Sequence, residues 1–174
     1  MDKHFLLRVE KTLKEIKRVL LLNKKIRTLL VHDSKAWEEG EPEIPTIQLA
    51  KDNIFLQPII DSDIEPPFNK KVYISITLTA SGFSNQLDIV ADHAIKVSIM
   101  VHKTNWLYGD ENIRALHIMQ EVINELHGLR LACSNALEYE QTLQTIVDET
   151  MTGYSVLFGV IDGLGSTEEE QNAF

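Results

Sequence analysis

Apolar and polar residues alternate along three stretches of the chain, with the period of two that is typical of a β-strand with one buried face. These stretches cover residues 72–79, 94–102 and 154–160. In the second stretch the alternating apolar residues are Ile95, Val97, Ile99 and Val101. We expect the three stretches to form strands of one sheet whose apolar side faces the core.

Two further segments carry weaker strand signals. Residues 53–60 (NIFLQPII) predict a short strand that Pro58 ends or confines to a sheet edge. Residues 135–153 fit either a strand or a helix, and the spacing of Leu137, Tyr139, Gln141 and Leu143 favours a strand.

Apolar positions three and four residues apart predict two amphipathic helices. The first covers residues 3–31, and Asn23 marks a candidate break in it. For the second helix, Asp110 is the expected N-cap and Gly128 the expected C-terminal stop. Its main apolar stripe is Ile113, Leu116, Met119, Ile123 and Leu126, widened by Ala115, Ile118 and Val122. So broad a stripe predicts packing across a sheet.

The order of these elements predicts an α+β fold with a mostly antiparallel or mixed sheet, a long helix on one face and an additional N-terminal helix. We divide the chain into a basic N-terminal helix at residues 1–32, an α+β core domain at residues 33–162 and a flexible acidic tail at residues 163–174. The acid-rich start of the core domain, residues 33–52, is predicted to be a loop or an extended arm.

The net charge of -9 hides an uneven distribution along the chain. Residues 1–36 contain ten basic and four acidic residues, a balance of +6, whereas the other 138 residues contain seven basic and 22 acidic ones, a balance of -15. A basic helix attached to an acidic body suits contacts between subunits, and we predict Lys14, Lys17 and Lys24 as contact residues. A solvated helix face that happens to be basic explains these charges equally well.

The sequence contains no recognised catalytic, cofactor-binding or metal-binding pattern, and we expect neither an enzyme nor a cofactor. The run Asp61, Asp63 and Glu65 resembles the start of a calcium loop, but Pro66 stands where such a loop needs glycine. The single Cys133 cannot form an internal disulfide and is expected to be a small buried side chain.

Two other groups of polar residues have simple structural explanations. Asp88, Asp92 and His93 would approach His102 if their segments pair, and a polar hairpin edge accounts for them better than a metal site. The polar residues that we place on the solvent side of the second helix are His117, Glu121 and Glu125.

Partners and compartment follow from the same composition. No run approaches the ~20 apolar residues of a membrane span, and the N-terminus is too charged for a secretory signal, so we expect a soluble intracellular product. The basic helix lacks interleaved aromatic residues and the acidic body would repel phosphate, which argues against specific nucleic-acid recognition. Trp106 and Tyr108 are candidate contact residues: we expect Trp106 to pack between sheet and helix and Tyr108 to anchor an interface.

The order of elements from residue 53 to residue 162 resembles the tail terminator (tail completion) proteins of long-tailed bacteriophages. The resemblance lies in a strand that runs into HKTNWLYGDENIRALHIMQEVINELHG (residues 102–128), followed by a strand pair that closes with YSVLFGVID (residues 154–162). The resemblance concerns the order of the elements and the pattern of apolar and polar residues, because these segments contain no diagnostic motif. The N-terminal helix and residues 33–52 are longer than the family pattern, and the tail after Asp162 has no counterpart in it.

The resemblance implies a structural virion protein without catalysis, assembled in the host cytoplasm. Such a protein forms a homo-oligomeric ring of six copies at the head-proximal end of the tail, contacts the tail tube protein and joins the tail to the head-connector or neck proteins. DNA would pass its lumen without specific contacts. Two alternatives stay open: a neck or head-completion adaptor of the virion, and a small ligand-binding α+β domain.

Overall fold

The computed structural model describes residues 5–57, 72–80, 93–131, 136–147 and 149–160. The N-terminal half of these residues forms α1 (Phe5–Leu22), α2 (Lys24–Val31), α3 (Ser34–Glu38), α4 (Ile47–Lys51), β1 (Ile54–Phe55) and β2 (Val72–Ala80). The second half forms β3 (His93–His102), the 3-10 helix η3 (Lys103–Asn105), β4 (Leu107–Tyr108), β5 (Asn112–Ile113), α5 (Arg114–Leu126), β6 (Leu137–Ile146) and β7 (Met151–Val160).

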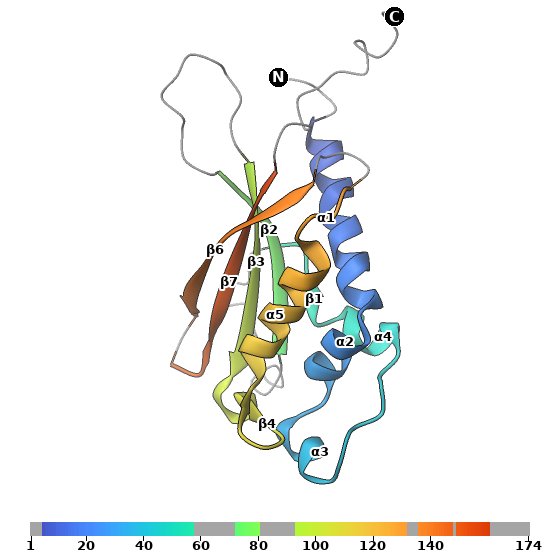
Figure 1. The fold of residues 1–174 in the computed structure, drawn as a ribbon, viewed down its shortest axis with the longest axis vertical. Helices are drawn as coiled ribbons and strands as arrows, with labels where there is room; N and C mark the ends of the chain where they lie inside the picture. The colour runs from blue at the N-terminus through green and yellow to red at the C-terminus, as the bar shows by residue number, and fades with distance from the viewer. Residues whose placement is uncertain (1–4, 58–71, 81–92, 132–135, 148, 161–174) are drawn as a thin grey trace, which may run out of the picture.

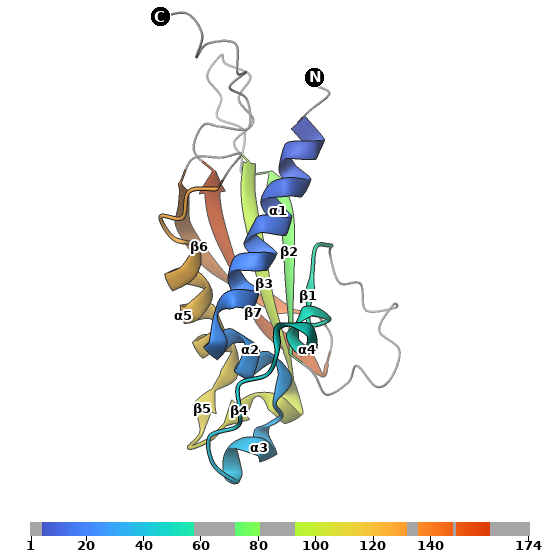
Figure 2. The same ribbon diagram turned by 90° about the vertical axis from the view of Figure 1, so that its right-hand side faces the viewer.

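Five of the strands form one sheet in the order β1-β2-β3-β7-β6. β1 is parallel to β2, and the other neighbours are antiparallel. The helices α1, α2 and α5 lie together on one face of this sheet, as the two views at right angles show (Figures 1 and 2). The predicted α+β class, with a mixed and mostly antiparallel sheet, is therefore confirmed.

The core lies between this sheet and the helices. Its strand residues occupy alternate positions on β2, β3 and β7, because successive side chains of a strand point to opposite faces. The inward residues Val72, Ile74, Ile76, Ile95, Val97, Ile99, Val101, Val156 and Phe158 are all buried. The helices contribute Ile16, Leu20, Ile26, Leu29, Ile118, Val122 and Leu126 to the same cluster. The alternation in the sequence thus identified the buried face correctly.

The predicted break in the first helix is also confirmed. Asn23 has the extended backbone of an N-cap (φ -70°, ψ 117°), and its side chain accepts a hydrogen bond from the backbone N–H of Ile26. The residue ends α1 and begins α2, because an asparagine cap satisfies an N–H group that has no partner inside the new helix.

The second helix begins three residues later than predicted, because its N-cap is Ile113 rather than Asp110. Gly109 and Glu111 both have positive φ values, 54° and 62°, and the turn that contains them joins β4 to β5. A residue with positive φ cannot belong to a right-handed helix, so α5 starts only at Arg114. At the other end, α5 stops at Leu126, just before Gly128 with φ 78°.

The buried face of α5 is also rotated from the predicted stripe. Its buried residues are Arg114, Ala115, Ile118, Val122 and Leu126. The positions that we placed at the centre of the stripe, Ile113, Leu116, Met119 and Ile123, are half-buried.

Three further expectations are corrected or resolved. Residues 33–52 are not only a loop, since they contain the short helices α3 and α4. Of the predicted strand at residues 53–60, residues 54–55 form β1, which lies at the sheet edge as expected, and residues 58–60 lie outside the described residues. Of the two readings of residues 135–153, the strand is correct, because β6 and the first residues of β7 occupy them. Residues 163–174 lie outside the described part of the chain.

Candidate functional site

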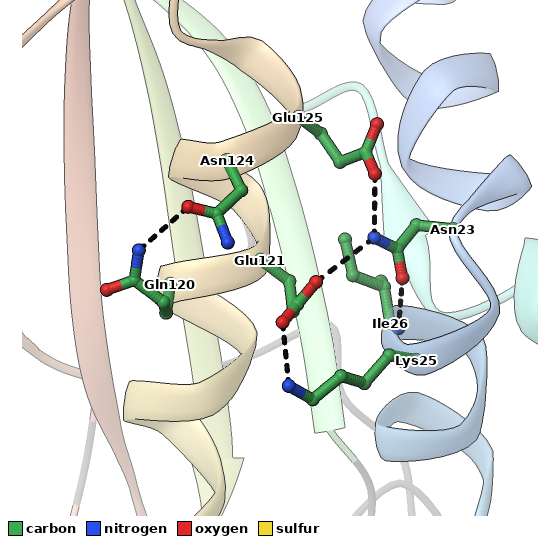
Figure 3. A network of polar contacts seen from close by, with 7 residues as sticks. All are labelled: Asn23, Lys25, Ile26, Gln120, Glu121, Asn124 and Glu125. Atoms are coloured by element: carbon green, nitrogen blue, oxygen red, sulfur yellow. Dashed lines mark hydrogen bonds and ion pairs between the residues drawn. The ribbon is translucent and has the colours of Figure 1, made fainter.

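The junction between α1 and α2 is attached to α5 by a group of polar contacts (Figure 3). Asn23 Nδ2 donates to Glu125 Oε1 at 2.8 Å and to Glu121 Oε2 at 3.3 Å. Lys25 Nζ donates to Glu121 Oε1 at 2.7 Å. The side chain of Asn23 therefore caps α2 with its oxygen and binds α5 with its nitrogen.

These contacts correct our placement of Glu121 and Glu125 on a solvated helix face. Both carboxylates face the N-terminal helices, and the hydrogen bond from Lys25 is the main reason that the pKa of Glu121 lies below its ordinary value. His117 of the same group is also half-buried and meets the ring of Tyr108 edge-on at 5.4 Å. Every residue of the set thus contributes to packing within the subunit.

The three lysines predicted as contact residues lie in different surroundings. Lys17 Nζ donates to the carbonyl oxygen of Lys51 at 3.0 Å and to that of Ile54, so it binds α4 and β1 to α1. Burial and the nearby Lys51 charge lower the pKa of Lys17. Lys14 is exposed and pairs with Glu10 one turn away, and Lys24 is exposed at the start of α2. Lys17 therefore already has a role inside the subunit.

A buried arginine links α5 to the end of α2. Arg114 has no exposed surface, and its Nη1 donates to the carbonyl oxygens of Leu29, at 3.1 Å, and of His32. These carbonyls are at the C-terminal end of α2, where a cation is favourable. Burial lowers the pKa of Arg114 to about 10, so its guanidinium stays charged at neutral pH.

Aromatic side chains surround this guanidinium. The Tyr108 ring lies 5.6 Å from Arg114 Cζ and meets the Trp37 ring edge-on at 4.7 Å. Tyr108 is only 8% exposed, and burial raises the pKa of its hydroxyl. This position corrects the expectation that Tyr108 projects as an interface anchor. Trp106 is half-buried against the core, and its ring centroid lies 6.3 Å from that of Tyr154.

Sequence reasoning missed Arg114, although the signal was present. Arg114, Ile118 and Val122 are spaced four residues apart, so they share one face of a helix. We centred the apolar stripe on Leu116 and Met119, which left the arginine at its margin. A charged residue on the buried face of a helix predicts a specific partner, because an unpaired buried charge is too costly to retain.

The outer strand β6 forms an open edge of the sheet. Tyr139, Leu143 and Ile146 on this strand are 40%, 44% and 71% exposed. At the start of β6 the outer side is occupied, since Leu137 N donates to Leu129 O at 3.0 Å and Tyr139 N donates to His127 Nδ1 at 3.2 Å. Beyond this point, no strand in the described part of the chain pairs with the outer side of β6. Exposed apolar residues on an unpaired edge are typical of a contact surface.

The described residues contain no group of three or more side chains suited to bind a metal ion. His93 and His102 stand at opposite ends of β3, so they are about 30 Å apart rather than adjacent. Asp61, Asp63, Glu65, Asp88, Asp92 and Cys133 lie outside the described residues. Among the helices that the structure describes, none is long and apolar enough to cross a membrane.

The comparison with known families adds the decisive observation. The YomW family model matches residues 14–160, which is most of the chain. The chain belongs to the YomW family. This is a phage-derived family of the SPbeta-like prophage type. The YomW match begins inside α1 and ends at the last residue of β7, so it includes both the Asn23 junction and the β6 edge. No curated protein matches the sequence.

Proposed function

We propose that this YomW family protein is a structural virion protein, a tail terminator that forms a ring at the head-proximal end of the tail and joins it to the head connector. Membership of a phage-derived family supports the phage part of this proposal. The tail terminator part rests on the resemblance of residues 53–162 to the order of elements in that family.

The observation that carries the proposal is the open edge at β6. A ring requires each subunit to present two different surfaces that bind each other, as in any head-to-tail assembly. The β6 edge supplies one such surface, because Leu143 and Ile146 are exposed and no strand in the described part of the chain pairs with the outer side of β6 there. Lys14 and Lys24, both exposed on the basic helices, supply charge that an acidic neighbour could bind.

The acidic body suits a passage for DNA. The residues after position 36 carry a balance of -15, and like charges prevent tight contacts with phosphate. DNA would then slide through the ring without binding to it. The proposed partners are further copies of this chain, the tail tube protein and the head-connector or neck proteins, in a protein that works without catalysis or cofactor.

Labelling of assembled particles tests the position in the virion. We expect a tag fused to this protein to be seen by electron microscopy at the head-proximal end of tails, both in complete particles and in tails without heads. Label on the portal vertex of tailless heads alone would contradict the terminator and favour the neck or head-completion adaptor. Absence of label from particles and tails would contradict a virion role.

A further inference from the structure

The two edges of the large sheet differ in what they offer to another strand. On one side, β1 covers only Ile74 and Ser75 of β2. The exposed side of β1 is restricted, because the carbonyl oxygen of Ile54 accepts a hydrogen bond from Lys17. No strand in the described ranges pairs with residues 76–80 of β2 on this side. On the other side, no strand of the described residues pairs with β6 beyond Gln141.

The directions of these two edges are complementary. The strands β2, β3, β7 and β6 are antiparallel in succession, so β6 runs opposite to β2. Copies related by rotation about an axis along the strands keep these directions. The β6 of one copy would therefore meet the β2 of the next copy in antiparallel orientation.

We propose that residues 142–146 of β6 pair with residues 76–80 of β2 in the neighbouring copy, which makes one continuous sheet around the ring; this inference rests on the ring proposed above. In this register Ile146 faces Ile76, Thr145 faces Thr77 and Leu143 faces Thr79. Each of the five residues 142–146 is then paired with one of the five residues 76–80 of the neighbouring copy.

The register keeps each side chain on its proper face. Within one copy, Ile76 pairs with Val97, Val97 with Val156 and Val156 with Thr142. Thr142 and Ile76 therefore lie at the same position along the strands. The proposed pairing places Thr142 opposite Ala80, an offset of four residues. An even offset leaves the inward and outward faces continuous between copies, whereas an odd offset would exchange them.

The same offset has the size that a closed sheet requires. Four residues extend about 13 Å along a strand, and four strands span about 19 Å across the sheet. Each copy therefore shifts the register by about 13 Å along the strands for every 19 Å or so across the sheet. This ratio corresponds to strands tilted by about 35° from the ring axis, and closed sheets have tilts of about 35–45°. The length of the open edges and the number of strands are thus consistent with closure.

Cross-linking between two single-cysteine variants tests this register. Both variants carry Cys133→Ser; one also carries Leu143→Cys and the other Thr79→Cys, and a size tag distinguishes them. Directly opposite residues of paired strands are about 5 Å apart, so a short bis-maleimide should join the two variants in a mixture but neither variant to itself. A mixture of Leu143→Cys with Glu39→Cys, at the exposed C-cap of α3, is the control. Each variant should melt at the temperature of the parent.

The mass of the uncross-linked mixture separates the two proposals. A ring mass with the heterologous cross-link supports both. A ring mass without this cross-link overturns the strand pairing and leaves the ring in place. Cross-linking of Leu143→Cys to itself also overturns it, because that product requires two β6 edges to meet. A monomeric mass without cross-link overturns both the ring and the pairing.

Discussion

Asn23 and Glu125 are 102 residues apart in the sequence, yet Asn23 Nδ2 donates to Glu125 Oε1 at 2.8 Å. This contact joins the break in the N-terminal helix to α5 (Figure 3). Since the same side chain caps α2 through its oxygen, one residue determines both where the helix breaks and where it docks.

Substitutions at Asn23 should separate these two roles. Asn23→Ser keeps a capping oxygen but removes the donor to Glu121 and Glu125, whereas Asn23→Ala removes both. We expect Asn23→Ala to lower the free energy of unfolding by about 2–3 kcal/mol, of which the cap accounts for about 1 kcal/mol. Urea denaturation should place Asn23→Ser between wild type and Asn23→Ala. Equal stability of all three proteins would show that the junction contributes nothing.

Acid should weaken the same junction. The pKa of Glu121 is lowered in the folded protein from an ordinary value of 4.5. The carboxylate therefore stabilises the fold above about pH 4.5, and this contribution is lost as the pH falls through the folded pKa. Denaturation measured between pH 7 and pH 3 should show a smaller loss of stability for Glu121→Gln than for wild type.

The matched control for this titration is Glu138→Gln, which removes the same charge from an exposed position on β6. Its stability should follow the wild-type dependence on pH. If Glu121→Gln also follows the wild-type curve, the carboxylate has the same pKa in the folded and unfolded states, and the proposed stabilisation is wrong.

Arg114 should be required for the docking of α2. Arg114→Met fills a similar volume but leaves the carbonyl oxygens of Leu29 and His32 without their donor, which should cost about 2–4 kcal/mol. Arg114→Lys keeps the charge and one donor group and should recover part of the loss. Thermal unfolding of the three proteins measures the difference. A methionine variant as stable as wild type would mean that these carbonyls need no donor.

Replacing Tyr108 should destabilise the subunit more than replacing Trp106, which is the reverse of the order expected from the sequence. Tyr108 is almost fully buried between Trp37, His117 and Arg114, whereas Trp106 is only half-buried. We expect Tyr108→Ala to lower stability by about 3–5 kcal/mol and Trp106→Ala by less. Calorimetry of the isolated subunit tests this order. A larger loss for Trp106→Ala would restore the original assignment.

Part of this fold could be predicted because local signals and packing agree. The alternation from Ile95 to Val101 identified a buried strand face, and Asn23 gave the helix break. The start of α5 was misplaced because Asp110 has the chemistry of an N-cap, while Gly109 and Glu111 adopt the positive φ values of a turn. A residue type favours certain backbone conformations, but packing against the rest of the protein determines which of these conformations is adopted.

The contact sites were harder to predict because they depend on strand order and on distant partners. β7 lies between β3 and β6, so nothing in the local sequence of β6 shows that it forms the edge. Lys17 has the sequence character of a solvated base, yet it binds two carbonyl groups more than 30 residues away. Charge along a helix therefore indicated a basic face without showing which of its residues remain exposed.

The mass of the assembled protein tests the central claim, a ring of identical subunits, most directly. Native mass spectrometry of the purified full chain, over a range of protein concentrations, should give a species of about six subunits with a fixed mass. A protein that stays monomeric at the highest concentration, and that is also absent from rings in assembled particles, would contradict the ring and the function proposed from it.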